Sequence, residues 1–178
     1  VVGGGVGCAI ALPVARALHE QGSEVTSIVG FRNHDLVILE DEFKSISDRF
    51  YMLTDDGSYG EKGNVCLPLN RLLEGGERFD AVITIGPLVM MKFVAAATRP
   101  YGVRTIASMN PIMIDGTGMC GCCRVTVGGE MKFACVDGPD FDAHLIDFDE
   151  AMKRSRTYAE FEAAAREKHC NLFRKEVN

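Results

Sequence analysis

The sequence predicts an α/β fold built on a five-stranded parallel sheet, followed by a small cysteine-rich lobe and a C-terminal helix. Two observations predict this class. Strand-like and helix-like segments alternate from Val1 to about Asn110, and that alternation gives a parallel sheet with helices on both faces. After Asn110 the alternation stops, and a segment rich in Gly, Cys and Met follows.

The expected elements of the first part follow in regular order. We expect strands at 1–2, 24–31, 50–54, 80–85 and 104–108, and helices at 9–21, 41–48, 65–73 and 88–98. In such sheets, ligands bind at the carboxyl ends of the strands. The loops at 3–7, 55–60 and 86–87 are therefore expected to meet at one edge.

The rest of the chain suggests two further parts, so that the boundaries fall at 1–110, 111–146 and 147–178. The middle part contains a hairpin, with strands at 124–127 and 131–134 joined by two glycines. The last part is expected to form one charged helix over 149–168. Its predicted docking stripe consists of Met152, Tyr158, Phe161 and Ala164 or Ala165.

Composition excludes several classes of protein. The 178 residues carry a net charge of −6 with both signs mixed, so a basic nucleic-acid-binding surface is not expected. No apolar run is long enough for a membrane span, and no secretory signal is visible. We therefore expect a cytoplasmic protein with no nucleic-acid or membrane partner. The seven cysteines are an odd number, which disfavours a disulfide framework and favours metal binding.

Four residues have the spacing of an iron–sulfur site. Four residues separate Asp115 from Cys120, two separate Cys120 from Cys123, and a more distant Cys135 follows. This spacing of four candidate ligands is typical of plant-type 2Fe–2S proteins. Cys122 lies between two of these residues and could replace one of them as a ligand; it is interpreted as a bystander that packs under the cluster. Two alternatives stay open at this point, a tetrahedral zinc site and a group of buried, inert thiols.

The glycine-rich turn after the first strand has the setting of a phosphate site. Gly3, Gly4, Gly5, Val6 and Gly7 lie between a strand and a helix, where backbone N–H groups and the helix dipole can hold a pyrophosphate. The full G-x-G-x-x-G pattern does not fit, because Cys8 occupies its last position when it is counted from Gly3. A tight turn that binds nothing is the alternative.

Two further loops are candidate nucleotide contacts. Asp55, Asp56, Gly57 and Ser58 follow the third strand, and carboxylates there can accept hydrogen bonds from a ribose and repel a 2′-phosphate. This favours NAD(H) over NADP, although Arg32 after the second strand argues the other way. A solvated turn is the alternative for the acidic loop.

The Gly86-Pro87 pair closes the fourth strand. It is expected to turn the chain sharply beneath the ligand. No catalytic side-chain acid or base is predicted.

Taken together, these motifs resemble the dihydroorotate dehydrogenase electron-transfer subunit and its relative, the small subunit of NADH-dependent ferredoxin:NADP oxidoreductase, also called sulfide dehydrogenase. Both belong to the ferredoxin–NADP reductase superfamily. The resemblance runs from Gly3 to about Arg154. It is carried by the motifs at 3–7, 54–60, 85–87 with Met90-Met91, 115–123 and 135–139.

This resemblance implies a Rossmann-like NAD-binding domain over 1–110, an iron–sulfur-binding lobe over 111–146 and a helical tail over 147–178. It also implies that electrons pass between NAD(H), FAD and a 2Fe–2S cluster to a large flavin-containing catalytic subunit, with ferredoxin as a further candidate partner. Because the first strand is a two-residue stub, we expect the family's FAD-binding barrel to precede Val1, and the fragment alone to be inactive.

Three positions depart from the family pattern. Ile10 stands where many relatives have proline, Ile85 stands where many have cysteine, and Asp115 stands where the dihydroorotate branch has cysteine. With an aspartate at position 115, the sequence more closely resembles the ferredoxin:NADP oxidoreductase branch of the family. The alternative function from a different class is a zinc-stabilised α/β scaffold without redox activity.

Overall fold

The computed structural model describes residues 1–169 and the side chains of residues 1–166. The strands are β1 (Val2–Gly4), β2 (Thr26–Phe31), β3 (Arg49–Thr54), β4 (Glu61–Lys62), β5 (Ala81–Ile85), β6 (Arg104–Ser108), β7 (Arg124–Val127), β8 (Glu130–Phe133) and β9 (Asp140–Asp142). The α-helices are α1 (Gly7–Glu20), α2 (Glu40–Ile46), α3 (Cys66–Glu74), α4 (Leu88–Thr98), α5 (Phe148–Ser155) and α6 (Ala159–His169). No helix in this part of the chain is both long and apolar enough to cross a membrane.

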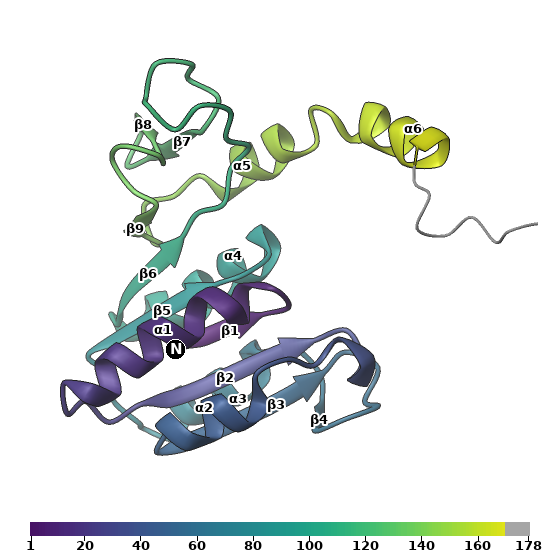
Figure 1. The fold of residues 1–178 in the computed structure, drawn as a ribbon. Helices are drawn as coiled ribbons and strands as arrows, with labels where there is room; N and C mark the ends of the chain where they lie inside the picture. Colours follow the sequence, from purple (N-terminus) through teal and green to yellow (C-terminus); the bar gives the residue numbers. More distant parts are fainter. Residues whose placement is uncertain (170–178) are drawn as a thin grey trace, which may run out of the picture.

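One mixed sheet forms the centre of the molecule, in the order β4-β3-β2-β1-β5-β6-β9 (Figure 1). The five parallel strands β3, β2, β1, β5 and β6 confirm the predicted sheet. One strand at each edge was missed. β4 has only two residues, and β9, which runs antiparallel to β6, is too short and acidic to show an apolar period.

The strand order creates a switch point beside β1. Val2 of β1 pairs with Ile28 of β2 on one side and with Thr84 of β5 on the other. Right-handed crossovers to the two sides place helices on opposite faces of the sheet. The loops after β1 and β5 therefore meet at the carboxyl edge, which is where such folds bind ligands.

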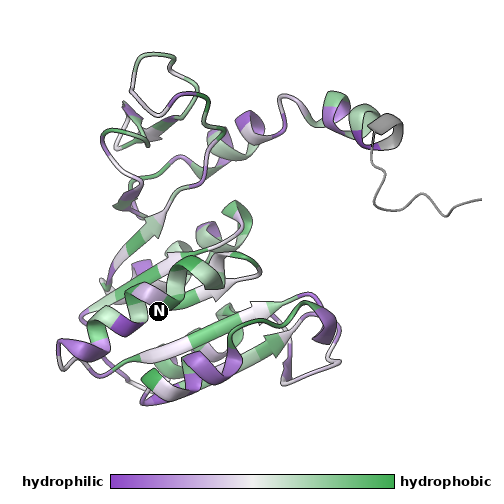
Figure 2. Cartoon of the chain, in the orientation of Figure 1, coloured by the Kyte–Doolittle hydropathy of each residue, from purple (hydrophilic) through white to green (hydrophobic). Residues whose placement is uncertain are grey.

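Alternate residues of the strands fill two cores, one on each face. Val29 and Met52 point into the core covered by α1 and α2, while Ile28 and Leu53 point into the core covered by α3 and α4. Full burial of one such side chain contributes about 1.5–3 kcal/mol. Figure 2 shows the hydrophobic residues concentrated on the central strands and α4, with hydrophilic residues on α2.

A third core attaches the cysteine-rich lobe to the sheet. The lobe contains the β7–β8 hairpin, whose predicted two-glycine turn is confirmed, with φ of +61° at Gly128 and +81° at Gly129. Type I′ turns require positive φ at both central positions. The buried members of this core are Met91 and Ala95 of α4, Ala107 of β6, Met109, Val125 of β7, Ala143, Ile146, and Phe148 and Ala151 of α5.

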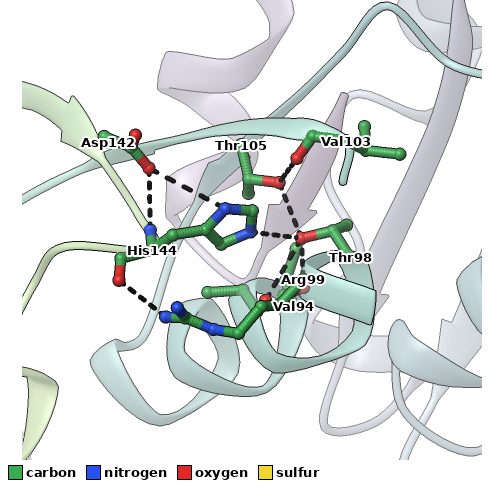
Figure 3. Close-up of polar contacts among 8 residues, drawn as sticks. Val94, Thr98, Arg99, Val103, Thr105, Asp142 and His144 are labelled. Carbon is green, nitrogen blue, oxygen red and sulfur yellow. Dashed lines mark hydrogen bonds and ion pairs between the residues drawn. The ribbon is translucent and has the colours of Figure 1, made fainter. Parts of the chain in front are cut away.

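A buried polar network reinforces the same junction (Figure 3). The Thr105 hydroxyl donates to Thr98 Oγ1 at 2.6 Å, and the Thr98 hydroxyl donates to the carbonyl oxygen of Val94 at 3.1 Å. His144 Nε2 lies 3.0 Å from Thr98 Oγ1. The Thr98 hydroxyl group therefore links α4 to both Thr105 of β6 and His144.

His144 is held from its backbone as well. Its N–H donates to Asp142 Oδ1 at 2.9 Å, and its carbonyl oxygen accepts from Arg99 Nη2 at 2.6 Å. Arg99 follows α4, whereas Asp142 ends β9. The network therefore fixes the C-terminal end of the lobe against the end of α4.

The single C-terminal helix predicted over 149–168 is wrong, because two helices occupy this region. α5 ends at Ser155 and α6 begins at Ala159. The hydroxyls of Ser155 and Thr157 donate to carbonyl oxygens three residues earlier, at 2.9 and 2.8 Å. Such bonds compete with helix continuation.

The predicted docking stripe makes no core in the part of the chain that the structure describes. Tyr158 is 47% exposed and Phe161 is 75% exposed, and α6 projects away from the sheet and the lobe (Figure 1). The last residues of the predicted tail, 170–178 with Cys170, lie outside the described residues.

Candidate functional site

The glycine turn joins β1 to α1 at the carboxyl edge of the sheet. Gly5 has φ of +53°, and its N–H donates to the Gly30 carbonyl oxygen at 2.9 Å. Val6 stands at the N-cap of α1 and provides no capping side chain. The first N–H groups of the helix consequently have no side-chain partner, as an anion-binding helix terminus requires.

The turn after β1 lies directly against the turn after β5. A Cβ atom on Gly7 would lie 2.5 Å from the carbonyl oxygen of Ile85 and 2.7 Å from Cα of Gly86. A Cβ atom on Gly86 would lie 3.1 Å from Cα of Gly4. The structure therefore brings the predicted residues of these two turns together, with Pro87 at the N-cap of α4 beside them.

The acidic loop meets the end of β2 at the same edge. The Asp56 N–H donates to the Arg32 carbonyl oxygen at 3.3 Å. Asp56 Oδ1 accepts from the N–H and hydroxyl of Ser58, at 2.9 and 2.6 Å, and these bonds, the hydroxyl first, hold the Asp56 pKa below its usual value. Asp55 and Arg32 have exposed side chains, and neither forms an ion pair within the described residues.

Two residues that the sequence did not indicate, His34 and Glu40, hold this loop in place. The His34 N–H donates to Ser58 Oγ at 2.8 Å, and the His34 ring lies 4.8 Å from the Tyr59 ring. The Tyr59 hydroxyl donates to the Glu40 carboxylate at 3.0 Å. These contacts join segments about 20 residues apart, so no local pattern could have revealed them.

The four candidate metal ligands lie in two groups in the lobe. Cys123 and Cys135 face each other across the start of the hairpin, with their Sγ atoms 3.2 Å apart. Asp115 Oδ1 accepts from the Thr117 N–H at 2.9 Å. The pKa of Asp115 is lowered, first by this bond and then by the thiol and N–H of Cys120. Asp115 and Cys120 are thus neighbours.

The contact between the two thiols shifts their pKa values in opposite directions. Burial would raise the pKa of Cys123, but hydrogen bonds from the Cys135 N–H and thiol lower it overall. The pKa of Cys135 is raised, mainly by the thiol–thiol hydrogen bond with Cys123. Of the two thiols, Cys123 is therefore the more readily deprotonated, and the thiolate is the form that binds a metal.

The remaining described cysteines have different environments. Burial raises the pKa of Cys8 to about 12, and the pKa of Cys66 is raised for the same reason. Cys122, predicted to pack beneath the cluster, is half-buried. Within the described side chains, no three His, Cys, Asp or Glu residues converge closely enough to hold one metal ion.

A cavity of about 230 Å³ adjoins the cysteine loop. It lies between the N-terminus of α4, the segment before the loop, and the end of α5. Cys120 and Cys122 line it from the lobe, and Arg124 and Arg154 supply its charged groups. Sequence reasoning singled out neither arginine. Arg154 lies 32 positions away from Cys122, whose carbonyl oxygen it contacts.

Comparisons with known proteins agree with these motifs. Residues 110–147 match the family described as the iron–sulfur cluster binding domain of dihydroorotate dehydrogenase B. The chain is 49% identical over 168 residues to a Thermotoga maritima protein named as a dihydroorotate dehydrogenase B (NAD(+)) electron transfer subunit homolog, covering 94% of this chain and 59% of that protein. It is 50% identical over 165 residues to an uncharacterized Clostridium beijerinckii protein of the adh 3′ region, covering 92% of this chain and 56% of that one.

A solved structure of an NADH-dependent reduced ferredoxin-NADP oxidoreductase shares the fold. The TM-score is 0.85 at 48% identity, over 96% of this chain and 61% of that chain. The chain thus spans somewhat more than half the length of the relatives that it matches. Residues 110–147 thus match the iron–sulfur cluster binding domain of dihydroorotate dehydrogenase B, and the chain as a whole is similar to electron-transfer subunits of that enzyme and to an NADH-dependent ferredoxin-NADP oxidoreductase.

Proposed function

We propose that this chain is the NAD-binding and iron–sulfur part of an electron-transfer subunit in a flavin-linked oxidoreductase. In this proposal, electrons pass between NAD(H), an FAD and a 2Fe–2S cluster to a large flavin-containing subunit. The observation that carries the proposal is the two-pair arrangement of Asp115, Cys120, Cys123 and Cys135 within a lobe that matches an iron–sulfur binding family.

The donor set fits a two-iron centre better than a single metal ion. A structural zinc site needs four ligands around one ion, whereas the described side chains offer one thiol–thiol pair and one carboxylate–thiol pair. Two pairs suit two irons, one pair for each. The cluster would supply one-electron transfer, and its ligands would be the three thiolates and the Asp115 carboxylate.

Backbone geometry supports the same assignment. Gly116, Gly118 and Gly121 all have positive φ, at +76°, +81° and +67°, so the loop reverses direction at each of them. The Gly118 backbone also contributes a hydrogen bond to Cys135. Such contacts bring N–H groups to ligand sulfurs, which tunes an iron–sulfur centre.

The nucleotide would lie across the carboxyl edge between β1 and β5. The uncapped start of α1 would bind its pyrophosphate. Because Gly7 and Gly86 carry no side chains, the backbone of these two turns could approach the pyrophosphate closely. Asp55 and Asp56 would face the adenosine ribose. These residues orient the nucleotide, and the chemistry belongs to the cofactors.

Metal analysis of the purified protein tests the proposal. We expect visible absorbance of an iron–sulfur centre, with two iron atoms and two acid-labile sulfides per chain, the content of a 2Fe–2S site. A colourless protein that contains one zinc per chain would contradict the proposal and favour the scaffold alternative.

Coenzyme preference is a separate prediction. NADH should bind more tightly than NADPH, because the exposed carboxylates repel a 2′-phosphate. Asp55→Asn should improve NADPH binding by about 1 kcal/mol, roughly fivefold, the scale of one charge pair in water. Asp80→Asn is the matched control, since it removes one exposed carboxylate at the opposite edge, just before β5. Fluorescence titration measures both affinities. Tighter binding of NADPH than of NADH by the wild type would contradict this prediction and indicate that Arg32 accommodates the 2′-phosphate.

A further inference from the structure

Helix α5 is fixed independently of the cysteine loop. Its Phe148 and Ala151 are buried in the third core. The Asp147 side chain caps it by accepting from the Glu150 N–H at 2.9 Å, and the Asp147 N–H donates to the Thr126 carbonyl oxygen of β7 at 2.9 Å. A side chain on the last turn of α5 is therefore held in a defined place relative to the lobe.

Arg154 reaches from that last turn to the loop between the ligands. Its Nη2 donates to the carbonyl oxygen of Cys122 at 3.2 Å, and Cys122 lies between Cys120 and Cys123 in the chain. Arg154 is half-buried. One side chain on a fixed helix thus holds the backbone of the segment that carries two of the proposed ligands.

A second guanidinium lies on the same segment. Nη1 of Arg124 is 3.3 Å from the position that a Cβ atom on Gly121 would occupy. Arg124 and Arg154 both line the 230 Å³ cavity with Cys120 and Cys122, and no carboxylate is among the lining residues. In a chain with a net charge of −6, this is a local concentration of positive charge directly behind the cysteine loop.

We propose that Arg154 is a positioning residue for the Cys120–Cys123 segment, and that Arg154 and Arg124 together raise the reduction potential of the bound cluster. The inference rests on the proposed iron–sulfur function. Three thiolates and a carboxylate make an anionic centre, and reduction adds one more negative charge. Positive charges near the cluster would stabilise its reduced form more than its oxidised form.

Four variants of the cluster-loaded protein separate charge from position. Arg154→Gln removes the charge and shortens the side chain, so that the bond to the Cys122 carbonyl is lost, whereas Arg154→Lys keeps both the charge and a donor. Arg124→Gln removes the second charge without touching that carbonyl bond. Lys153→Gln is the matched control, since Lys153 precedes Arg154 on α5 and is exposed. The readouts are iron and sulfide per chain and a dye-mediated redox titration followed by visible absorbance.

We expect Arg154→Gln and Arg124→Gln each to lower the reduced-to-oxidised ratio at a fixed potential by up to about tenfold, which is 59 mV for one electron. Arg154→Lys and Lys153→Gln should change it by less than about twofold. If Arg154→Gln holds no cluster while Lys153→Gln is fully loaded, positioning is supported, and Arg124→Gln then decides the effect on potential.

Other outcomes separate this inference from the proposed function. Fully loaded Arg154→Gln and Arg124→Gln proteins with the potential of Lys153→Gln would overturn the inference and leave the proposed function intact. Wild-type protein without iron and sulfide would instead overturn the proposed function itself.

Discussion

Replacing Cys135 by alanine should abolish iron–sulfur binding, whereas replacing Cys122 by alanine should leave it in place. The Sγ atom of Cys135 lies 3.2 Å from that of Cys123, so its loss breaks one of the two proposed ligand pairs. Arg154 donates a hydrogen bond to the backbone carbonyl oxygen of Cys122, and an alanine at position 122 retains that oxygen. The expected result is iron at background level in the first variant and near-normal iron in the second.

The measurement is iron and acid-labile sulfide per chain, together with visible absorbance. Loss of the cluster should also lower the stability of the lobe, because a group that binds only the folded state stabilises it. Urea unfolding of the two variants measures that difference. Equal iron loss in both variants would make Cys122 a ligand, and full iron retention in Cys135→Ala would remove Cys135 from the site.

Gly7→Ala should have the largest effect on the nucleotide site. The new methyl carbon would lie 2.5 Å from the Ile85 carbonyl oxygen and 2.7 Å from Gly86 Cα. Both are backbone atoms, so no rotamer change relieves the overlap, and the turns after β1 and β5 must move apart. Overpacking of this kind costs about 1–3 kcal/mol and sometimes more. We expect that loss in the free energy of unfolding, together with loss of measurable NADH binding.

Gly22→Ala provides the control for a general glycine effect. Gly22 has φ of +83° with no atom within 4 Å of a built Cβ, and it lies at the far end of α1. Alanine there should cost about 1–2 kcal/mol from left-handed strain and leave NADH affinity unchanged. Urea unfolding and NADH titration decide the comparison, and a Gly7→Ala protein with wild-type affinity would show that the two turns do not form the nucleotide site.

Local signals explain why much of the sheet could be predicted. α4 and β6 have the predicted bounds, 88–98 and 104–108, because Gly86-Pro87 and Arg99-Pro100 mark the ends of the helix. β9 could not be predicted, since Asp140–Asp142 becomes a strand only by pairing with the exposed edge of β6. The break between α5 and α6 depends on side-chain bonds of Ser155 and Thr157, which compete with a helical pattern that otherwise continues.

The sequence by itself determined the α/β class, the glycine turn and the ligand spacing around Asp115 and Cys135, because each depends on residues that are close in the chain. Tertiary structure alone decided three other features. It brought Gly7 against Gly86, joined Ser58 to His34, and placed Arg154 on the Cys122 carbonyl. These contacts join segments between 24 and 79 positions apart, and they form only when strands and helices pack around shared cores.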